Sequence, residues 1–361
     1  MKRTGKVRRI SIFLYAIFAI SVILYIISSY SEALAGFLVS TVGFAIRRTL
    51  GLITGVFPFS LFELFIITSP VILVFVVISA IRALRREGGA VRYTTSILAI
   101  ISLLSSMFIY TLGLPYKTER ISDRMSLDIS DESVSENLIR VAYLVRDSVN
   151  EYAEKIKTDD GATEMPYNMR ELSRRLSEGY SALSEDYPYV EGHRGYVKPV
   201  IFSSFLSRVG LTGIYTYPSG ESNVNVEYPD YCVAFTSAHE MAHARGISRE
   251  DEASFVAFLV SIYSDDDYIR YSGYLNLYEY LASAVRRVDP DEYKRLAGGL
   301  SNVARADIRA SYEVYKKYEG SRLGEIGDKL NDSYLKANGE DGTVSYSYVT
   351  KLVVAYLSGE K

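Results

Sequence analysis

The chain has 361 residues, of which 48% are hydrophobic, and it carries a net charge of −3 and a single cysteine. This balance offers no basic field for nucleic acid, so we expect no nucleic-acid partner, and one cysteine excludes an intrachain disulfide. Apolar residues crowd positions 1–114, whereas most of the charge follows them. The sequence therefore predicts a membrane domain at 1–114 and a soluble domain after it.

The first predicted membrane span covers residues 10–29, which contain no charged residue, no proline and no glycine. A run of about 20 apolar residues is long enough to cross the hydrocarbon core as a helix. A cleaved signal peptide is the alternative, because "ALA" at 33–35 resembles a cleavage site. The length of the run and the spans that follow it favour a retained anchor.

Two further spans are predicted at about 61–81 and 94–114. The earlier span starts at "PFSLFE", where Ser60 and Glu63 have the spacing of a capping box and can satisfy free N–H groups at the helix start. The later span is rich in Ser and Thr, whose hydroxyls can bond back to the helix or pack against a neighbouring helix.

The intervening segment, 31–59, is apolar but interrupted by glycines, and Arg47 and Arg48 stand at its centre. A charge at the centre of the bilayer is costly. We therefore expect an interfacial amphipathic segment here rather than a fourth span.

Lysines and arginines gather in the N-terminal tail and in the loop at 82–92. Such an excess is typical of cytoplasmic segments. Three spans then place the N-terminus in the cytoplasm and the chain after Pro115 outside it. The expected product is a multi-pass membrane protein with the lipid bilayer as a partner.

Residues 115–134 are polar and lack periodicity, which predicts a linker. Apolar residues then recur at helical spacing over much of 135–361, except at 213–228, where two extended stretches flank a "PSGES" turn. The predicted fold class is mainly α, with transmembrane helices followed by a mostly helical soluble domain that has a small β-sheet. Helices are expected, among other places, at 199–209, 268–288, 292–318, 323–337 and 345–357.

The stretch "HEMAH" contains two of the three histidines of the chain. His239 and His243 are four residues apart, so on a helix they lie on one face and can bind one ion. Glu240 follows His239 directly and can lie beside a water molecule bound to that ion. Two histidines and a glutamate at this spacing form the zinc-metallopeptidase motif, in which the glutamate is the general base. An ordinary helix that carries two histidines is the alternative, and the scarcity of histidine counts against it.

A catalytic zinc ion takes three protein ligands. Gly246 can end the first helix in left-handed geometry, and "SRED" at 248–251 has a capping-box pattern for a second helix. Glu252 lies on the apolar face of that second helix, and a carboxylate on an inward face needs a partner. We therefore expect Glu252 to be the third ligand. The apolar face consists of Phe255, Val256, Leu259 and Ile262.

Residues 213–275, with "HEMAHARGISREDEASF" and "YSGYL", resemble the bacterial membrane-protein family called domain of unknown function 3810, as does "PFSLFE". That family is regarded as zincin-like metallopeptidases without an established substrate. The resemblance implies a zincin-like domain on a bacterial cell membrane, in which His239, His243 and Glu252 bind one catalytic Zn²⁺ and Glu240 is the base. This chain has "EAS" at 252–254, where such proteins commonly have Glu-Ala-Asn, a difference beside the expected ligand.

A substrate peptide can add as a strand to the sheet next to the site. The stretch "SNVNVEY" at 222–228, which contains Asn223 and Asn225, is placed for this role. A purely structural hairpin is the alternative. Glu221 is a candidate to orient a ligand histidine.

The oxyanion of a tetrahedral intermediate needs a hydrogen-bond donor besides the metal. Tyr271 and Tyr274 in "YSGY" and His193 in "EGHRGY" are candidates. Because the chain contains 31 tyrosines, a packing role is the alternative for each of them.

The sequence thus predicts a membrane-anchored zinc metallopeptidase that hydrolyses peptide bonds in a peptide or protein substrate. Two alternatives stay open: a zinc-dependent amidase that acts on cell-wall peptides, and a non-catalytic, metal-stabilised module that binds or signals at the membrane. A divalent metal other than zinc also stays open.

Overall fold

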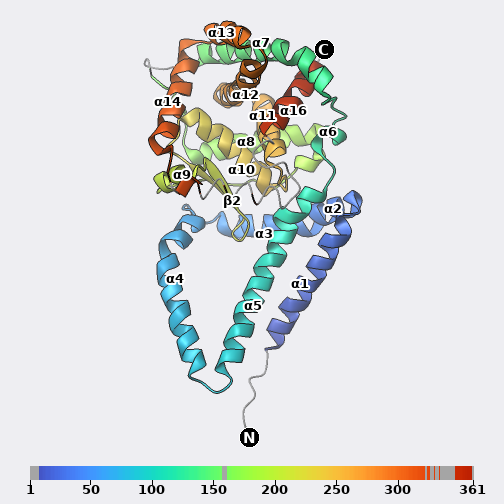
Figure 1. Ribbon diagram of the computed structural model, residues 1–361, viewed down its shortest axis with the longest axis vertical. Helices are drawn as coiled ribbons and strands as arrows, with labels where there is room; N and C mark the ends of the chain where they lie inside the picture. Colours follow the sequence, from blue (N-terminus) through green and yellow to red (C-terminus); the bar gives the residue numbers. More distant parts are fainter. Residues whose placement is uncertain are drawn as a thin grey trace.

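The computed structural model describes residues 8–156, 161–321 and 346–359, together with 323–325, 329 and 333. Figure 1 shows long N-terminal helices below and a helical C-terminal domain above them. The N-terminal elements are α1 (Arg9–Ser28), α2 (Glu32–Leu38), the π-helical turn η1 (Val39–Gly43), α3 (Phe44–Thr54), α4 (Leu61–Leu84), α5 (Gly89–Phe108) and the π-helical turn η2 (Ile109–Gly113).

Among the described residues, four N-terminal helical segments are long and apolar enough to cross a membrane, namely Arg9–Ser28, Glu32–Thr54, Leu61–Leu84 and Gly89–Lys117. Three of them coincide with the spans predicted from the sequence. The most apolar stretch of Leu61–Leu84 has no buried residue, and a helix that exposes apolar side chains all round is suited to lipid rather than water. These helices indicate a membrane protein.

The remaining segment, Glu32–Thr54, is the one expected to be interfacial. It has the length and composition of a span, but α3 runs crosswise along the base of the C-terminal domain, whereas α1, α4 and α5 follow the long axis (Figure 1). Lys198 Nζ donates to the carbonyl oxygen of Thr54 at 2.9 Å. The segment therefore packs against the C-terminal domain.

Helices α1 and α5 pack against each other, and both contain buried small residues. Ser21 and Ser28 of α1 and Ser102 and Ser106 of α5 are all buried, and small side chains let two helix backbones approach closely. The start of α1 and the turn between α4 and α5 lie at the same end of the molecule, opposite the C-terminal domain (Figure 1).

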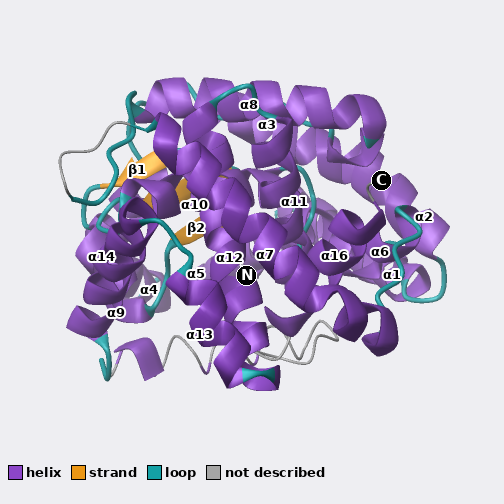
Figure 2. Ribbon diagram, turned by 90° about the horizontal axis from the view of Figure 1, so that it is seen from above, coloured by secondary structure: helices purple, strands orange, loops and turns teal. Residues whose placement is uncertain are grey.

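The C-terminal domain is mainly helical, as predicted. Its helices are η3 (Leu114–Lys117), α6 (Ile121–Arg124), α7 (Asp131–Lys155), α8 (Met169–Asp186), η4 (Pro188–Val190), α9 (Ser203–Val209), α10 (Asp230–Ala244), α11 (Glu250–Tyr263), α12 (Asp267–Val288), α13 (Pro290–Gly298), α14 (Asn302–Tyr318) and α16 (Tyr346–Gly359). The sheet lies to one side of these helices (Figure 2).

The small sheet has three strands in the part of the chain that the structure describes: β1 (Lys198–Val200), β2 (Gly213–Thr216) and β3 (Glu221–Asn225), in the order β1-β3-β2. β3 pairs parallel with β1 and antiparallel with β2. The predicted hairpin is therefore confirmed. β1 was not predicted, because it begins the stretch expected to be a helix at 199–209, of which only α9 is helical.

One other predicted helix differs from the structure. The stretch 292–318 forms α13 and α14, because the chain turns after Gly298 and the Ser301 hydroxyl then accepts the N–H of Ala304 to start α14. Most of 323–337 lies outside the described residues, whereas the helix expected at 345–357 corresponds to α16.

The segment 115–134 is not the loosely packed linker that its composition predicted. Pro115, Tyr116, Ile121 and Ser122 are buried, and Ile121 belongs to the main hydrophobic core. The polar composition predicted an exposed linker, but the backbone of this segment forms hydrogen bonds with buried charged side chains at the start of α11. The segment is therefore packed although it is polar.

Candidate metal centre

The "HEMAH" stretch lies in α10, and the end of this helix is defined by hydrogen bonds. Gly246 has a φ of 93°, and its N–H donates to His243 O at 2.9 Å, while the N–H of Ile247 donates to Ala242 O at 3.2 Å. This is a Schellman motif. The expectation that Gly246 ends the helix in left-handed geometry is confirmed, and the turn brings α11 back onto α10.

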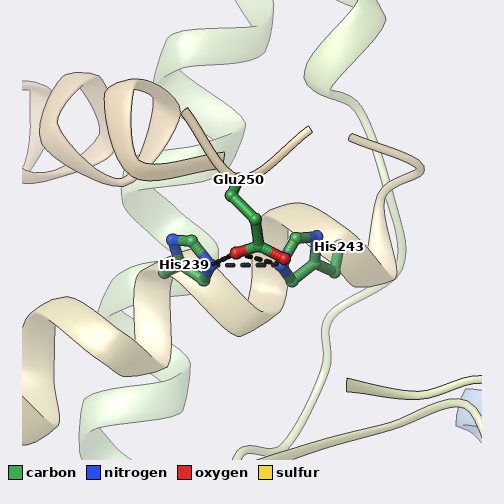
Figure 3. A group of neighbouring side chains, drawn as sticks. All are labelled: His239, His243 and Glu250. Carbon is green, nitrogen blue, oxygen red and sulfur yellow. Dashed lines mark hydrogen bonds and ion pairs between the residues drawn. The ribbon is translucent and has the colours of Figure 1, made fainter. Parts of the chain in front are cut away.

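Figure 3 shows His239, His243 and Glu250 pointing toward one another from α10 and α11. The two Nε2 atoms are 3.0 Å apart, and Glu250 Oε2 lies 3.1 Å from His239 Nε2 and 3.6 Å from His243 Nε2. Two ligand atoms on one tetrahedral zinc ion lie roughly 3.3 Å apart. The spacing of these three side chains, which we call the ligand trio, therefore suits one such ion.

The outer nitrogen of each imidazole has a partner that fixes the ring. His243 Nδ1 lies 2.7 Å from Ile247 O, and because a carbonyl oxygen only accepts, Nδ1 carries a hydrogen, so in the neutral ring Nε2 has the lone pair that can bind a metal. His239 Nδ1 lies 3.1 Å from the hydroxyl of Ser254. With Ser254 as acceptor and both rings neutral, two nitrogen lone pairs and a carboxylate oxygen face one point, which is repulsive unless a metal ion or a proton lies between them.

The pKa shifts of His243 and Glu250 agree with a preference for positive charge at this point, whereas that of His239 follows from its burial. Burial alone would lower the pKa of His243, but the Glu250 carboxylate outweighs burial and raises it to about 9. Burial alone would raise the pKa of Glu250, yet the neighbouring His243 holds it below its usual range. Burial lowers the pKa of His239. A metal ion would compete with a proton for these donors.

Glu240 is buried beside the trio, with 5% of its surface exposed. Its Oε2 has no hydrogen-bond partner among the described residues. Burial raises the pKa of Glu240 to about 8, against the effects of His243 and of the Tyr215 backbone N–H. Gly213 leaves room for this carboxylate, because a Cβ at Gly213 would lie 2.5 Å from Glu240 Oε1.

The structure corrects the predicted third ligand. Glu252 does not join the trio: its Oε1 accepts the N–H of Ile121 at 3.0 Å, and both of its oxygens lie 3.4 Å from Arg249 Nη1. The inward carboxylate does have the partner that its burial requires, but that partner is a guanidinium. Glu250 takes the place expected for Glu252.

The error came from the use of one apolar face to orient α11. Every residue from Asp251 to Ser261 is buried, so the helix has no solvent face against which to define an inward one. Glu250 and Ser254 are four residues apart and face α10 together. This spacing could have identified Glu250 from the sequence. The predicted capping box at 248–251 is also wrong, because Arg249 stands at the N-cap position without a side-chain bond.

Glu221 does not orient a ligand histidine. Its carboxylate forms a buried ion pair with Lys198 and accepts the N–H groups of Leu61 at 3.1 Å and Phe62 at 3.2 Å. An acidic group at the start of a helix is favourable, so Glu221 caps α4. Ser60 also caps α4 by accepting the Glu63 N–H at 3.0 Å.

Asn223 and Asn225 lie on β3, which is the central strand and is paired on both sides. A substrate strand cannot add there, so this prediction is wrong. The side chain of Asn223 accepts a hydrogen bond from Ser60, and that of Asn225 donates to Ser207 Oγ and Leu211 O.

None of the three candidate oxyanion donors joins the trio. The Tyr271 hydroxyl donates to Asp307 at 2.6 Å, and Tyr274 stacks on Tyr152 with ring centroids 5.7 Å apart. His193 lies against Gly51 of α3, where burial and the nearby Arg245 lower its pKa to about 4. The predicted roles of these residues as donors are not supported by their positions.

A family model described as "Protein of unknown function (DUF3810)" matches residues 40–354. No curated protein and no solved structure matches the chain. The matched range includes α4, α5, the sheet and the whole ligand trio.

Proposed function

The chain belongs to this family of unknown function, and we propose that it is a membrane-anchored, zinc-dependent peptidase. The observation that carries the proposal is the unpartnered Oε2 of the buried Glu240 beside three converging metal-ligand atoms. A purely structural ion would need no such carboxylate, and a buried carboxyl oxygen without a partner is costly.

Two imidazoles and one carboxylate form a ligand set used by catalytic zinc, which keeps one position open. Zn²⁺ held by the trio would act as a Lewis acid and make water available as a nucleophile near neutral pH. Glu240 would take a proton from the attacking water and return it to the amide nitrogen as the C–N bond breaks. Burial raises the pKa of Glu240 to about 8, and a cation held by the trio would lower it again and favour the carboxylate that accepts the proton.

The edge strand β2 offers a place for the substrate. Asn225 N–H donates to Thr212 O at 2.8 Å, and with the β2–β3 register this directs the backbone groups of Gly213 and Tyr215 away from β3. An extended peptide paired with that edge would pass beside Glu240, which lies against Gly213. Main-chain pairing gives affinity with little dependence on sequence.

The proposed orientation puts the active domain outside the cytoplasm. The start of α1, which follows the basic N-terminal tail in the sequence, and the basic loop at 82–92 belong to the end of the molecule opposite the C-terminal domain (Figure 1). Because basic segments stay in the cytoplasm, this end would be inside and α1, α4 and α5 would span a bacterial cell membrane. The α2–α3 segment would lie at the outer interface.

The test uses the full-length protein in nanodiscs, loaded with Zn²⁺ and assayed on a library of fluorogenic peptides. Glu240→Gln should retain zinc and lose hydrolysis by about 100-fold or more. Glu178→Gln, a matched change at an exposed ion pair in α8, should leave hydrolysis unchanged. Absence of hydrolysis in the zinc-loaded wild type, or full activity of Glu240→Gln, would overturn the proposal.

A further inference from the structure

The loop that delivers Glu250 to the histidines is bound to the segment that emerges from the last membrane helix. Arg249 is buried, and its Nη2 donates to Tyr116 O at 2.8 Å and to Thr118 O at 3.0 Å. Tyr116 and Thr118 lie just after α5, in and beyond η3. Arg249, the residue immediately before Glu250, is thus hydrogen-bonded to the segment that follows the last membrane helix.

The other side of Glu250 is attached to the same segment. Glu252 Oε1 accepts the N–H of Ile121 at 3.0 Å, and Asp251 Oδ2 lies 3.6 Å from Arg120 Nη1. Arg249 and Glu252 also contact each other at 3.4 Å. Residues on both sides of Glu250 are therefore held by 116–121, which we call the exit segment.

A second membrane-side contact holds the other end of the loop. Arg47 of α3 has 2% of its surface exposed, and its Nη2 donates to Val39 O at 3.1 Å and to Arg245 O at 3.4 Å. The guanidinium lies so close to Gly246 that a Cβ there would be 2.6 Å from Nη2. A cation at the C-terminal end of α10 is favourable, so Arg47 also stabilises the turn at Gly246.

Glu250 has few restraints of its own. It is the first residue of α11, so its N–H has no partner within the helix. Its carboxylate faces the two histidines. The position of this ligand therefore depends on what holds its neighbours.

We propose that the exit segment, through Arg249 and Glu252, and Arg47 of α3 position Glu250, so that metal affinity depends on how the membrane helices pack against the domain. This rests on the metal site of the proposed function but not on hydrolysis. By linkage, a contact that favours the metal-binding arrangement must itself be favoured when the metal binds. Metal binding should thus stabilise residues that are not ligands.

Hydrogen exchange of the full-length wild type in nanodiscs, with and without saturating Zn²⁺, tests this linkage. We expect Zn²⁺ to slow exchange both in 236–256 and in the exit segment. The effect should be clearest at the Ile121 N–H, which donates a hydrogen bond to Glu252. Slower exchange confined to 236–256 would overturn the proposal.

A variant gives an independent measurement. Arg249→Lys keeps the charge but loses the planar fork that binds two carbonyl oxygens, and we expect its zinc affinity to fall about 10- to 100-fold in competition with a chelator. Arg175→Lys is the matched control, because Arg175 is ion-paired with Glu171 and Asp266.

An unchanged zinc affinity of Arg249→Lys would contradict the positioning role. If Arg249→Lys fails to fold, the exchange experiment on the wild type decides. If the wild type binds no zinc, the metal site itself is wrong, and this outcome is distinct from a failure of the positioning role.

Discussion

The hydroxyl of Ser254 lies 3.1 Å from Nδ1 of His239, on the opposite edge of the ring from Glu250. Ser254 follows Glu250 by four residues on α11, so one face of this helix supplies both a proposed ligand and a group that orients a second proposed ligand. In this way Ser254 holds the imidazole of His239.

Ser254→Ala removes this partner without a large change in volume. We expect zinc affinity to fall about tenfold, because a ligand histidine without a fixed outer nitrogen is less well oriented. Competition with a chromophoric chelator measures this. Ser261→Ala is the control, since Ser261 is buried in the same helix and donates to Ala257 O. Equal affinities for the two variants would show that Ser254 does not support the site.

Gly213→Ala tests the contact between the edge strand and the proposed base. The added Cβ would lie 2.5 Å from Glu240 Oε1 and 2.6 Å from Thr236 Cγ2, so the carboxylate has to move. We expect hydrolysis to fall about tenfold or more, since a small misplacement of a catalytic group is costly, while zinc content stays at the wild-type level.

The control for this change is Gly298→Ala in α13, where an added Cβ meets no atom within 4 Å. It should retain wild-type hydrolysis. If Gly213→Ala is as active as Gly298→Ala, then Glu240 does not act from the position that the structure gives it.

Glu279 predicts a pH dependence of stability away from the metal centre. Burial raises its pKa from 4.5 to about 7, although the Tyr231 hydroxyl partly offsets this by donating to Oε1 at 3.0 Å. The folded protein therefore prefers the neutral acid. The contribution of Glu279 to stability is fully present below about pH 4.5 and is lost as pH rises through about 7.

Glu279→Gln keeps an acceptor for Tyr231 but cannot ionise. Between pH 5 and pH 8 the melting temperature of the wild type should fall more than that of Glu279→Gln, as measured by thermal unfolding of the full-length protein in detergent. Parallel curves for the two proteins would mean that Glu279 ionises in the folded state without cost.

Much of the fold could be predicted because the apolar patterns are strong. The runs at 10–29, 61–81 and 94–114 correspond to α1, α4 and α5, and the "PSGES" turn correctly indicated the β2–β3 hairpin. β1 is only three residues long and its pairing with β3 is distant in sequence, so local patterns could not identify it.

The sequence predicted the two histidines of the site but not the carboxylate, and the difference has a physical cause. His239 and His243 are fixed by spacing within a single helix, so the sequence brings them together correctly. The choice between Glu250 and Glu252 depends on how a second helix is rotated, and α11 is buried on every side. The rotation is set by Arg249 and by the exit segment, which are contacts between parts of the chain more than 120 residues apart.

Zinc stoichiometry of the full-length protein tests the central claim most directly, measured by elemental analysis after saturation with Zn²⁺ and desalting. We predict one ion per chain in the wild type and in Glu178→Gln, whose carboxylate belongs to an exposed ion pair in α8, and almost none in Glu250→Ala. A wild type without zinc, or a Glu250→Ala variant that binds zinc as the wild type does, would contradict the assignment of His239, His243 and Glu250 as the ligands.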